Sequence, residues 1–526
     1  MTDSSPKQGR VVLVGAGPGD EGLLTLRGKE WLERADVIVY DYLVNWNMMR
    51  FASENAETIY AGKKAGHASL QQEEINSILI SKAREGKIVV RLKGGDPFIF
   101  GRGGEEAMAL KKAGIPFSVV PGVTSPIGVA AYAGIPLTHR DFSSTVSIIT
   151  GSNEKNQQDI RIDWEKIASR SGALVFLMGA RKLPQICEKL MRFGKDPATP
   201  VAVIQWGTTA RQKTWTGTLK TIVDIAMKEH IAPPALTIIG EVVNLKPLME
   251  WYETLPLFGK SVVITRADNQ ADSMIHLLHE KGAEPVSFPV IQTVPPQDWS
   301  PLDQALNRLS KYHGLIFTSV NGVKFFMQRL KETGQDIREL KGVRIYTIGP
   351  KTEKAVRAFG IQVDCVPDDF VAESLIESLG RENVKGKRFL IPRALVAREI
   401  LPDQLRDMGA QVDVVPAYQT VPPKRKNEDL AHRLKDGVID VITFTSSSTV
   451  TNFLDQTGPE LRPYLDRVTF ACIGPITANT AREKGLEVAI IPKQYTVDAL
   501  VSAIEDHYAD KTAPLRGEEK PASQEG

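Results

Sequence analysis

One stretch of the chain concentrates residue types that suit close contact with a small ligand. RLKGGDPFIFGRGGEE, residues 91–106, places Gly94 and Gly95 directly before an acidic residue. Two glycines let the backbone approach a ligand closely. Asp96 precedes a proline, which biases its backbone toward an extended conformation. The density of glycine, acid, proline and arginine predicts a binding loop rather than an ordinary surface turn.

A second glycine-rich stretch, GAGPGDEG at residues 15–22, has the Gly-x-Gly-x-x-Gly spacing of a dinucleotide-binding loop. Pro18 lies inside that spacing, and its ring removes a backbone amide that could hold a phosphate. The proline disfavours an NAD(P) site, so an NAD(P) enzyme remains an alternative and not the preferred interpretation.

Hydroxyl-bearing turns mark the second half of the chain. Thr318, Ser446 and Thr477 each follow a short apolar run, where α/β sheets place their ligands. Such turns bind anions at helix amino termini, although ordinary helix capping is the competing explanation. His276 and His279, three residues apart, are expected on a solvated helix face. We predict no metal site and see no nucleophile–base triad.

These segments require strands that end beside them. Runs such as RVVLVG, KIVVRL, ALVFLMG and SVVITR alternate with helical stretches, which predicts α/β architecture with mostly buried sheets. Residues 244–260 contain two prolines and no clear period, which favours an inter-domain connector.

The second half also repeats itself. FPVIQTVPP, from Phe288, recurs as VPAYQTVPP from Val415, and Arg266 corresponds to Arg393 at the same offset. A constant offset over several blocks predicts an internal duplication across residues 260–508.

Composition narrows the partners. The 526 residues include 65 basic and 63 acidic residues, so no global charge attracts nucleic acid or a membrane. The first residues lack an apolar signal core, and we expect a cytoplasmic protein.

Residues 9–247 resemble the S-adenosylmethionine-dependent uroporphyrinogen-III C-methyltransferases, a tetrapyrrole methylase family. The resemblance is carried by VGAGPGDEGLLTL, YDYLV, GKKAG, RLKGGDPFIFGRGGEE, PGVTS and GIPLTHRD. It implies two α/β domains with the active site between them, and Asp41 and Lys63 as proton acceptor and donor. Arg102, His139 and Arg140 are expected to meet substrate carboxylates. The implied positions for the methyl donor, S-adenosyl-L-methionine, are Pro18, Gly94, Gly95, Asp96, Ile99, Thr124, Ser125, Met178 and Gly207.

Residues 258–505 resemble uroporphyrinogen-III synthase through VITR, FTS-x-N-x-V, the second FTSS, IGPxTA and a late YT. The resemblance implies two α/β lobes joined by two hinge strands, which are the repeated segments. Tyr418 matches a tyrosine thought to assist loss of the substrate hydroxyl. Its structural alternative is an aromatic residue on an exposed strand. Thr318, Ser446 and Thr477 would bind acetate and propionate groups.

We therefore expect a bifunctional enzyme that closes hydroxymethylbilane to uroporphyrinogen III and methylates that product to precorrin-2, for sirohaem or cobalamin. Oxidation and metal insertion are expected of other proteins, and a homodimer is expected through the methyltransferase half. An alternative joins another tetrapyrrole methylase to a non-catalytic duplicated binding module. The expected bounds are 1–247 for the methyltransferase, 248–259 for a linker, 260–508 for the synthase (lobe one 260–293 and 422–508, lobe two 297–415) and 509–526 for a disordered tail.

Overall fold

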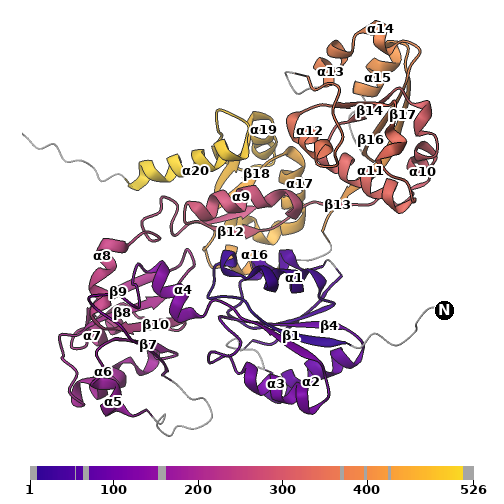
Figure 1. The fold of residues 1–526 in the computed structure, drawn as a ribbon. Coiled ribbons are helices and arrows are strands. Elements are labelled where there is room, and N and C mark those ends of the chain that lie inside the picture. The colour runs from indigo at the N-terminus through magenta and orange to yellow at the C-terminus, as the bar shows by residue number, and fades with distance from the viewer. Residues whose placement is uncertain are drawn as a thin grey trace, which may run out of the picture.

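The computed structural model describes residues 9–53, 55–62, 70–151, 162–367, 372–395, 400–423 and 428–512. Within these residues the strands form four five-stranded sheets. Two sheets belong to the first half of the chain and two to the second (Figure 1). This confirms the predicted α/β class.

The first sheet is entirely parallel. Its three central strands are largely buried, as expected when helices cover both faces. Because the strands are parallel, their carboxyl ends meet at one edge. Its strands, in spatial order, are β3 (Glu57–Tyr60), β2 (Val37–Tyr40), β4 (Ile88–Lys93), β1 (Arg10–Gly15) and β5 (Phe117–Val120). Its helices are α1 (Leu26–Arg34), α2 (Gln72–Arg84) and α3 (Gly103–Lys112).

The second sheet is mixed, because its central strand β10 runs antiparallel to both neighbours. The neighbours β7 and β8 therefore run parallel to each other, and their carboxyl ends share an edge. The strand order is β6 (Val146–Thr150), β7 (Ala173–Leu177), β10 (Ala235–Ile239), β8 (Pro200–Gln205) and β9 (Lys213–Thr218). The helices are α4 (Ser125–Tyr132), α5 (Trp164–Ala168), α6 (Leu183–Arg192) and α7 (Ile222–Lys228).

The third and fourth sheets contain the duplication. The third, in lobe one, is parallel, with the order β12 (Glu284–Ser287), β11 (Ser261–Ile264), β18 (Val441–Phe444), β19 (Thr469–Cys472) and β20 (Val488–Ile490). The fourth, in lobe two, has the order β13 (Gln292–Val294), β17 (Gln411–Val421), β16 (Arg388–Ala394), β14 (Gly314–Phe317) and β15 (Arg344–Thr347).

The two repeats exchange their parts. A shift of 388 − 261 = 127 carries β11 onto β16, and the same shift carries β12 onto β17 and β14 onto β18. Strands β11 and β12 pack in lobe one with β18 and β19 of the other repeat, whereas β14 and β15 pack in lobe two with β16 and β17. Each lobe is thus assembled from both repeats, which confirms the predicted duplication.

Helices cover both lobes and follow the same pattern. In lobe one they are α9 (Asp268–Glu280), α16 (Glu428–Lys435), α17 (Ser447–Thr457), α18 (Arg462–Leu465), α19 (Pro475–Glu483) and α20 (Val497–Thr512). In lobe two they are α10 (Ser300–Leu306), α11 (Val320–Glu332), α12 (Pro350–Arg357), α13 (Ala372–Leu379), α14 (Arg381–Val384) and α15 (Ile400–Asp407).

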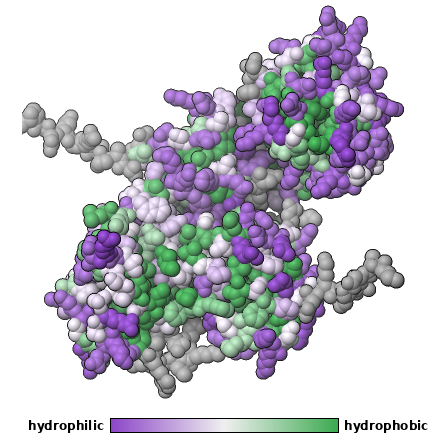
Figure 2. Space-filling model, in the orientation of Figure 1, coloured by the Kyte–Doolittle hydropathy of each residue, from purple (hydrophilic) through white to green (hydrophobic). Residues whose placement is uncertain are grey.

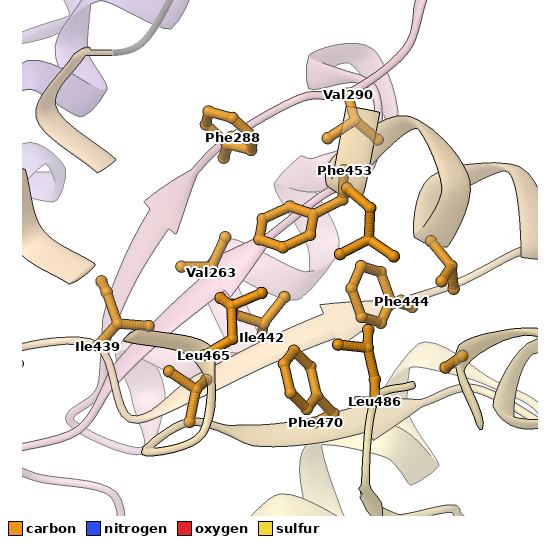
Figure 3. Close-up of a cluster of buried hydrophobic side chains, with 14 of the residues drawn as sticks. Val263, Phe288, Val290, Ile439, Ile442, Phe444, Phe453, Leu465, Phe470 and Leu486 are labelled. Carbon is orange, nitrogen blue, oxygen red and sulfur yellow. The ribbon is translucent and has the colours of Figure 1, made fainter. Parts of the chain in front are cut away.

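The repeated segments form the predicted hinge. Gln292 to Val294 of β13 pair antiparallel with Gln419 to Val421 of β17. The first copy is anchored in lobe one, where Phe288 and Val290 join the buried core (Figure 3). At the equivalent positions of the second copy, Val415 and Ala417 are buried in the core of lobe two. The same apolar pattern therefore anchors one strand in each lobe.

The connector is packed rather than loose. It begins with α8 (Lys246–Met249), and Tyr252 and Leu257 are buried. Leu257 joins the core of lobe one. At the other end of the chain, α20 continues to Thr512 and so includes the first residues of the predicted tail. Among the described residues, we find no helix with the length and apolar content needed to cross a bilayer.

Candidate functional site

Four glycines bring the loops at the carboxyl edge of the first sheet into contact. A side chain at Gly122 would lie 2.3 Å from the carbonyl oxygen of Gly95, and one at Gly15 would lie 2.5 Å from the amide nitrogen of Gly122. Gly17 and Gly95 also exchange backbone hydrogen bonds of 3.2 and 2.7 Å. The loop after β1 therefore lies directly against the predicted binding loop after β4.

Asp96 holds its own loop together. Its carboxylate accepts hydrogen bonds from the backbone amides of Phe98 (2.8 Å) and Ile99 (3.2 Å). It also accepts one from Gly122 (3.1 Å). Gly94 and Gly95 are left with bare backbone, and Gly95 has a φ of +68° that favours glycine. The loop is thus preorganised, and Gly94 and Gly95 carry no side chain that would keep a ligand away from it.

The second sheet supplies the opposite wall. Pro18 packs against Gly128 of α4, where a side chain would lie 2.7 Å from the proline ring. A side chain at Gly95 would lie 3.6 Å from the hydroxyl of Ser125. On the third side, a side chain at Gly207 would overlap Val129 of α4. The predicted positions Pro18, Gly94, Gly95, Asp96, Ile99, Thr124, Ser125 and Gly207 are therefore brought together.

Met178 directly follows β7, at the edge of the second sheet where the carboxyl ends of β7 and β8 both lie. It is one of several non-glycine residues with positive φ, a conformation that is uncommon and concentrates at functional sites. Phe100, Arg102, Trp206 and Thr208 also have positive φ, the last two on either side of Gly207.

Two residues that sequence reasoning missed hold the glycine-rich loop. The hydroxyl of Tyr132 donates to Asp20 Oδ2 at 2.6 Å. The backbone amide of Asp20 donates to Thr208 Oγ1 at 3.1 Å, and Thr208 is buried. Positive φ at a threonine beside Gly207 was the signal for Thr208, but it can be read only from the backbone.

Asp41 lies at the end of β2 above a buried cluster of charges. Its carboxylate bonds to Arg91 Nη2, and Lys93 Nζ lies 3.9 Å away. Beneath them, Glu106 Oε1 accepts from Arg91 Nε at 3.2 Å and from Lys93 Nζ at 2.9 Å. Arg91 is 2% exposed and Glu106 is fully buried, whereas the side chain of Asp41 is 30% exposed. Only the outermost carboxylate of this cluster can reach a substrate.

Burial and neighbouring charges shift the pKa values of the two cations in opposite directions. Burial alone would lower the pKa of Arg91, but Asp41 and Glu106 outweigh it and raise that pKa. Burial, followed by the positive charge of Arg91, lowers the pKa of Lys93 despite the same two carboxylates. Arg91 is therefore the fixed positive charge that holds Asp41 in place.

The residues expected to meet substrate carboxylates lie on two exposed segments. Arg102 forms a bidentate pair with Glu105, at 2.8 and 2.6 Å. His139 Nδ1 accepts from the amide of Asp141 at 3.2 Å, and Arg140 beside it is exposed. Lys63, the expected proton donor, lies outside the described residues.

In the second half, Tyr418 lies in the core of lobe two. Its ring is 9% exposed and stacks on Phe325 with a centroid separation of 5.8 Å. Its hydroxyl lies 3.1 Å from the hydroxyl of Ser319, which caps α11. The alternative of an aromatic residue on an exposed strand is therefore wrong. Only the hydroxyl points to the carboxyl edge of the sheet.

The three hydroxyl residues divide between the lobes. Thr318 follows β14 in lobe two and is half-buried. Ser446 caps α17 in lobe one by accepting from the amide of Thr449 at 3.3 Å, and Thr477 is buried in the first turn of α19. Helix capping thus accounts for one role of Ser446, and all three residues lie in the turns or first helical turns that follow strands.

His279 is not on a solvated face, contrary to the expectation from its spacing. Its Nε2 lies 3.4 Å from Glu21 Oε1 in the first half of the chain. His276 is exposed and pairs with Glu280 at 3.2 Å. The helix therefore turns one histidine to solvent and the other to the glycine-rich loop.

The comparisons with known proteins agree with this division. The sequence model of the tetrapyrrole (corrin/porphyrin) methylases matches residues 10–223, and that of uroporphyrinogen-III synthase HemD matches residues 272–502. The porphyrin biosynthesis protein HemD of Ruminiclostridium josui is 36% identical over 498 residues, which cover 95% of this chain and 98% of that protein. The uroporphyrinogen-III C-methyltransferase of Priestia megaterium is 52% identical over 236 residues, 45% of this chain and 99% of that protein.

Among solved structures, the uroporphyrin-III C-methyltransferase of Thermus thermophilus in complex with S-adenosylhomocysteine is 41% identical. The match covers 45% of this chain and all of that one, with a TM-score of 0.39.

The fold and loops define a two-part protein, with a two-domain methylase fold followed by a duplicated two-lobed fold. The chain belongs to the tetrapyrrole methylase family in its first half and to the uroporphyrinogen-III synthase family in its second.

Proposed function

We propose that this chain is a bifunctional enzyme of tetrapyrrole biosynthesis. Its second half closes linear hydroxymethylbilane to uroporphyrinogen III with inversion of the last ring. Its first half methylates that product at C2 and C7 and gives precorrin-2. The observation that carries the proposal is the presence of both families on one chain, because the product of one is the substrate of the other.

The residues around the glycine contacts at the carboxyl edge of the first sheet fit S-adenosylmethionine as methyl donor. Gly94 and Gly95 offer bare backbone, and small residues at Thr124 and Ser125 leave room beside it. When bound, the donor supplies an electrophilic methyl group on a sulfonium. We assign its binding to Pro18, Gly94, Gly95, Asp96, Ile99, Thr124, Ser125, Met178 and Gly207.

Asp41 is assigned the proton-accepting role in methyl transfer. Attack by a pyrrolic carbon places positive charge on the macrocycle, and a nearby carboxylate stabilises that charge or accepts the proton that is lost. Arg91 fixes Asp41 from below and leaves its outer face open. Lys63 is proposed as the proton donor, and Arg102, His139 and Arg140 are proposed to receive substrate carboxylates.

In the synthase half, we propose that the protein acts mainly by holding the substrate in shape, and less by supplying a strong acid or base. Loss of the substrate hydroxyl gives a carbocation-like azafulvene, so the protein must mainly hold the open chain in a closing geometry. Thr318, on lobe two, and Ser446 and Thr477, on lobe one, are proposed to bind acetate and propionate groups. Tyr418, beside the hinge pairing, would assist departure of the hydroxyl.

We also propose a cytoplasmic homodimer formed through the methyltransferase half. Apolar residues gather over the visible face of this half in Figure 2. Phe98 and Phe100, on either side of Ile99, are exposed. Exposed apolar patches of this kind mark interaction sites. The proposed domain bounds remain 1–247 and 260–508, with the two lobes of the synthase meeting at the hinge.

The synthase assignment is tested by incubating the purified chain with hydroxymethylbilane alone. We expect uroporphyrinogen III to form faster than the unaided closure, with the inverted isomer identified by chromatography. If hydroxymethylbilane closes at the same rate as without the protein and gives the non-inverted isomer, the alternative of a non-catalytic binding module is supported.

A further inference from the structure

The methylase half contacts lobe one of the synthase half through hydrogen bonds and ion pairs. Asn47, in a short 3₁₀ segment (Trp46–Phe51), donates to the carbonyl of Pro285 at 2.5 Å and accepts from the amide of Ser287 at 3.3 Å. These two residues belong to β12, the edge strand of lobe one, so the asparagine caps that edge. Arg50 bonds to Asp272 of α9 beside it.

Glu21 is the central residue of this contact. It lies three residues after Pro18, in the glycine-rich loop, and is only 4% exposed. Its Oε1 lies 3.4 Å from Arg50 Nη2 and 3.4 Å from His279 Nε2. A buried carboxylate needs such partners, because leaving it unpaired is strongly unfavourable. One of its two partners comes from lobe one.

A second route joins the same loop to lobe one. Tyr132, which donates to Asp20, packs edge-on against Tyr252 of the connector with ring centroids 4.7 Å apart. Tyr252 packs in turn against Phe258, at 5.3 Å. Phe258 lies beside the turn that follows α9, where a side chain at Gly282 would lie 3.3 Å from its Cα. Both routes begin in the loop that follows Pro18 and end at α9.

We propose that lobe one of the synthase half positions the methyl-donor site of the first half. His279 is the positioning residue, because it fixes the glycine-rich loop through Glu21. This inference rests on the proposed function of the first half. The physical reason is that the backbone of the glycine-rich loop forms one side of the proposed donor site, so the conformation of this loop sets how well the donor fits. Lobe one thus helps to fix the glycine-rich loop, which a methylase without this second half must fix through its own contacts.

The electrostatics at His279 support a charged contact. Burial alone would lower its pKa, but the hydrogen bond to Glu21 and the charges of Asp20 and Glu21 outweigh burial and the opposing Arg50, so the pKa is raised. Asp268, Asp272, His276 and Glu280 are the other titratable residues on the same helix. A raised pKa means that the contact is complete below about pH 6.5 and weakens as the pH rises through the folded value.

The test compares His279→Ala with His276→Ala in the full chain. His276 lies on the same helix, is exposed and contacts only Glu280 among the partners described. Binding of S-adenosylhomocysteine is measured by calorimetry, and KM and kcat for S-adenosylmethionine are measured with uroporphyrinogen III. We expect His279→Ala to weaken binding and raise KM about fivefold or more with little change in kcat. His276→Ala should match the parent chain.

Closure of hydroxymethylbilane reports on the fold of lobe one and should be unchanged in both variants. Equal binding of S-adenosylhomocysteine by the parent chain and His279→Ala would overturn the inference. Failure of the parent chain to bind this probe would instead remove the proposed methyltransferase function. A second variant, Glu21→Gln, keeps the hydrogen-bonding shape but removes the charge, and should also raise KM. If it binds as the parent does, the charged contact has no role.

Discussion

Asp41 is the residue on which the methyl-transfer chemistry depends. Replacing it by asparagine keeps an oxygen that can accept from Arg91, so the buried cluster should stay in place. We expect Asp41→Asn to bind S-adenosylhomocysteine normally and to lose about 10²-fold or more in kcat, as for loss of a general base. Single-turnover methylation of uroporphyrinogen III measures this directly.

Asp36 offers a matched control at the opposite end of the same strand. Its carboxylate accepts from the amide of Ile88 at 2.8 Å, far from the carboxyl edge of the sheet. Asp36→Asn should therefore change stability alone. A normal turnover in Asp41→Asn would remove Asp41 from the mechanism.

Tyr418 presents the corresponding question in the synthase half. Tyr418→Phe keeps the stacked ring and removes only the contact with Ser319, a loss of about 1 kcal/mol in the free energy of unfolding. We expect a modest reduction in closure of hydroxymethylbilane, because the substrate can lose water slowly unaided. Complete loss of folded protein would instead indicate a purely structural tyrosine.

Tyr312→Phe is the control for that change. Its hydroxyl donates to Asp413 at the amino end of the same sheet, away from the hinge. It should lower stability without changing turnover.

Glycine contacts set the geometry at the scale of the elements. Gly122→Ala would push a methyl group into the carbonyl of Gly95 and force the two loops apart. We expect affinity for S-adenosylhomocysteine to fall more than tenfold while closure of hydroxymethylbilane continues. Gly104→Ala in α3, where nothing lies within 4 Å, should leave binding unchanged and stabilise the helix by about 1 kcal/mol. Equal affinity in both variants would mean that the loops do not need this close approach.

The sequence predicted much of this level because its signals are local. Apolar runs located the strands, and the constant offset between Phe288 and Val415 revealed the duplication and the hinge. The exchange of parts between the lobes follows from that hinge. What could not be predicted are contacts that local patterns do not encode. The hydrogen bond of Tyr132 to Asp20 and the buried pairing of Glu106 with Arg91 and Lys93 depend on how elements pack.

The same limit is clearest for the whole molecule. Glu21 and His279 are 258 residues apart, and nothing in the spacing of either residue points to the other. The connector gave no period, yet its Tyr252 and Leu257 are buried against both halves. In Figure 1, lobe one lies between the methylase half and lobe two.

The central claim is that one chain performs two consecutive reactions, and a single measurement tests it. The full chain is supplied with hydroxymethylbilane and methyl-labelled S-adenosylmethionine, and the tetrapyrrole products are identified by absorption and mass spectrometry. We predict consumption of hydroxymethylbilane and accumulation of a macrocycle with two labelled methyl groups, with the spectrum of precorrin-2. Recovery of only unmethylated macrocycle, or of no inverted isomer at all, would contradict the claim.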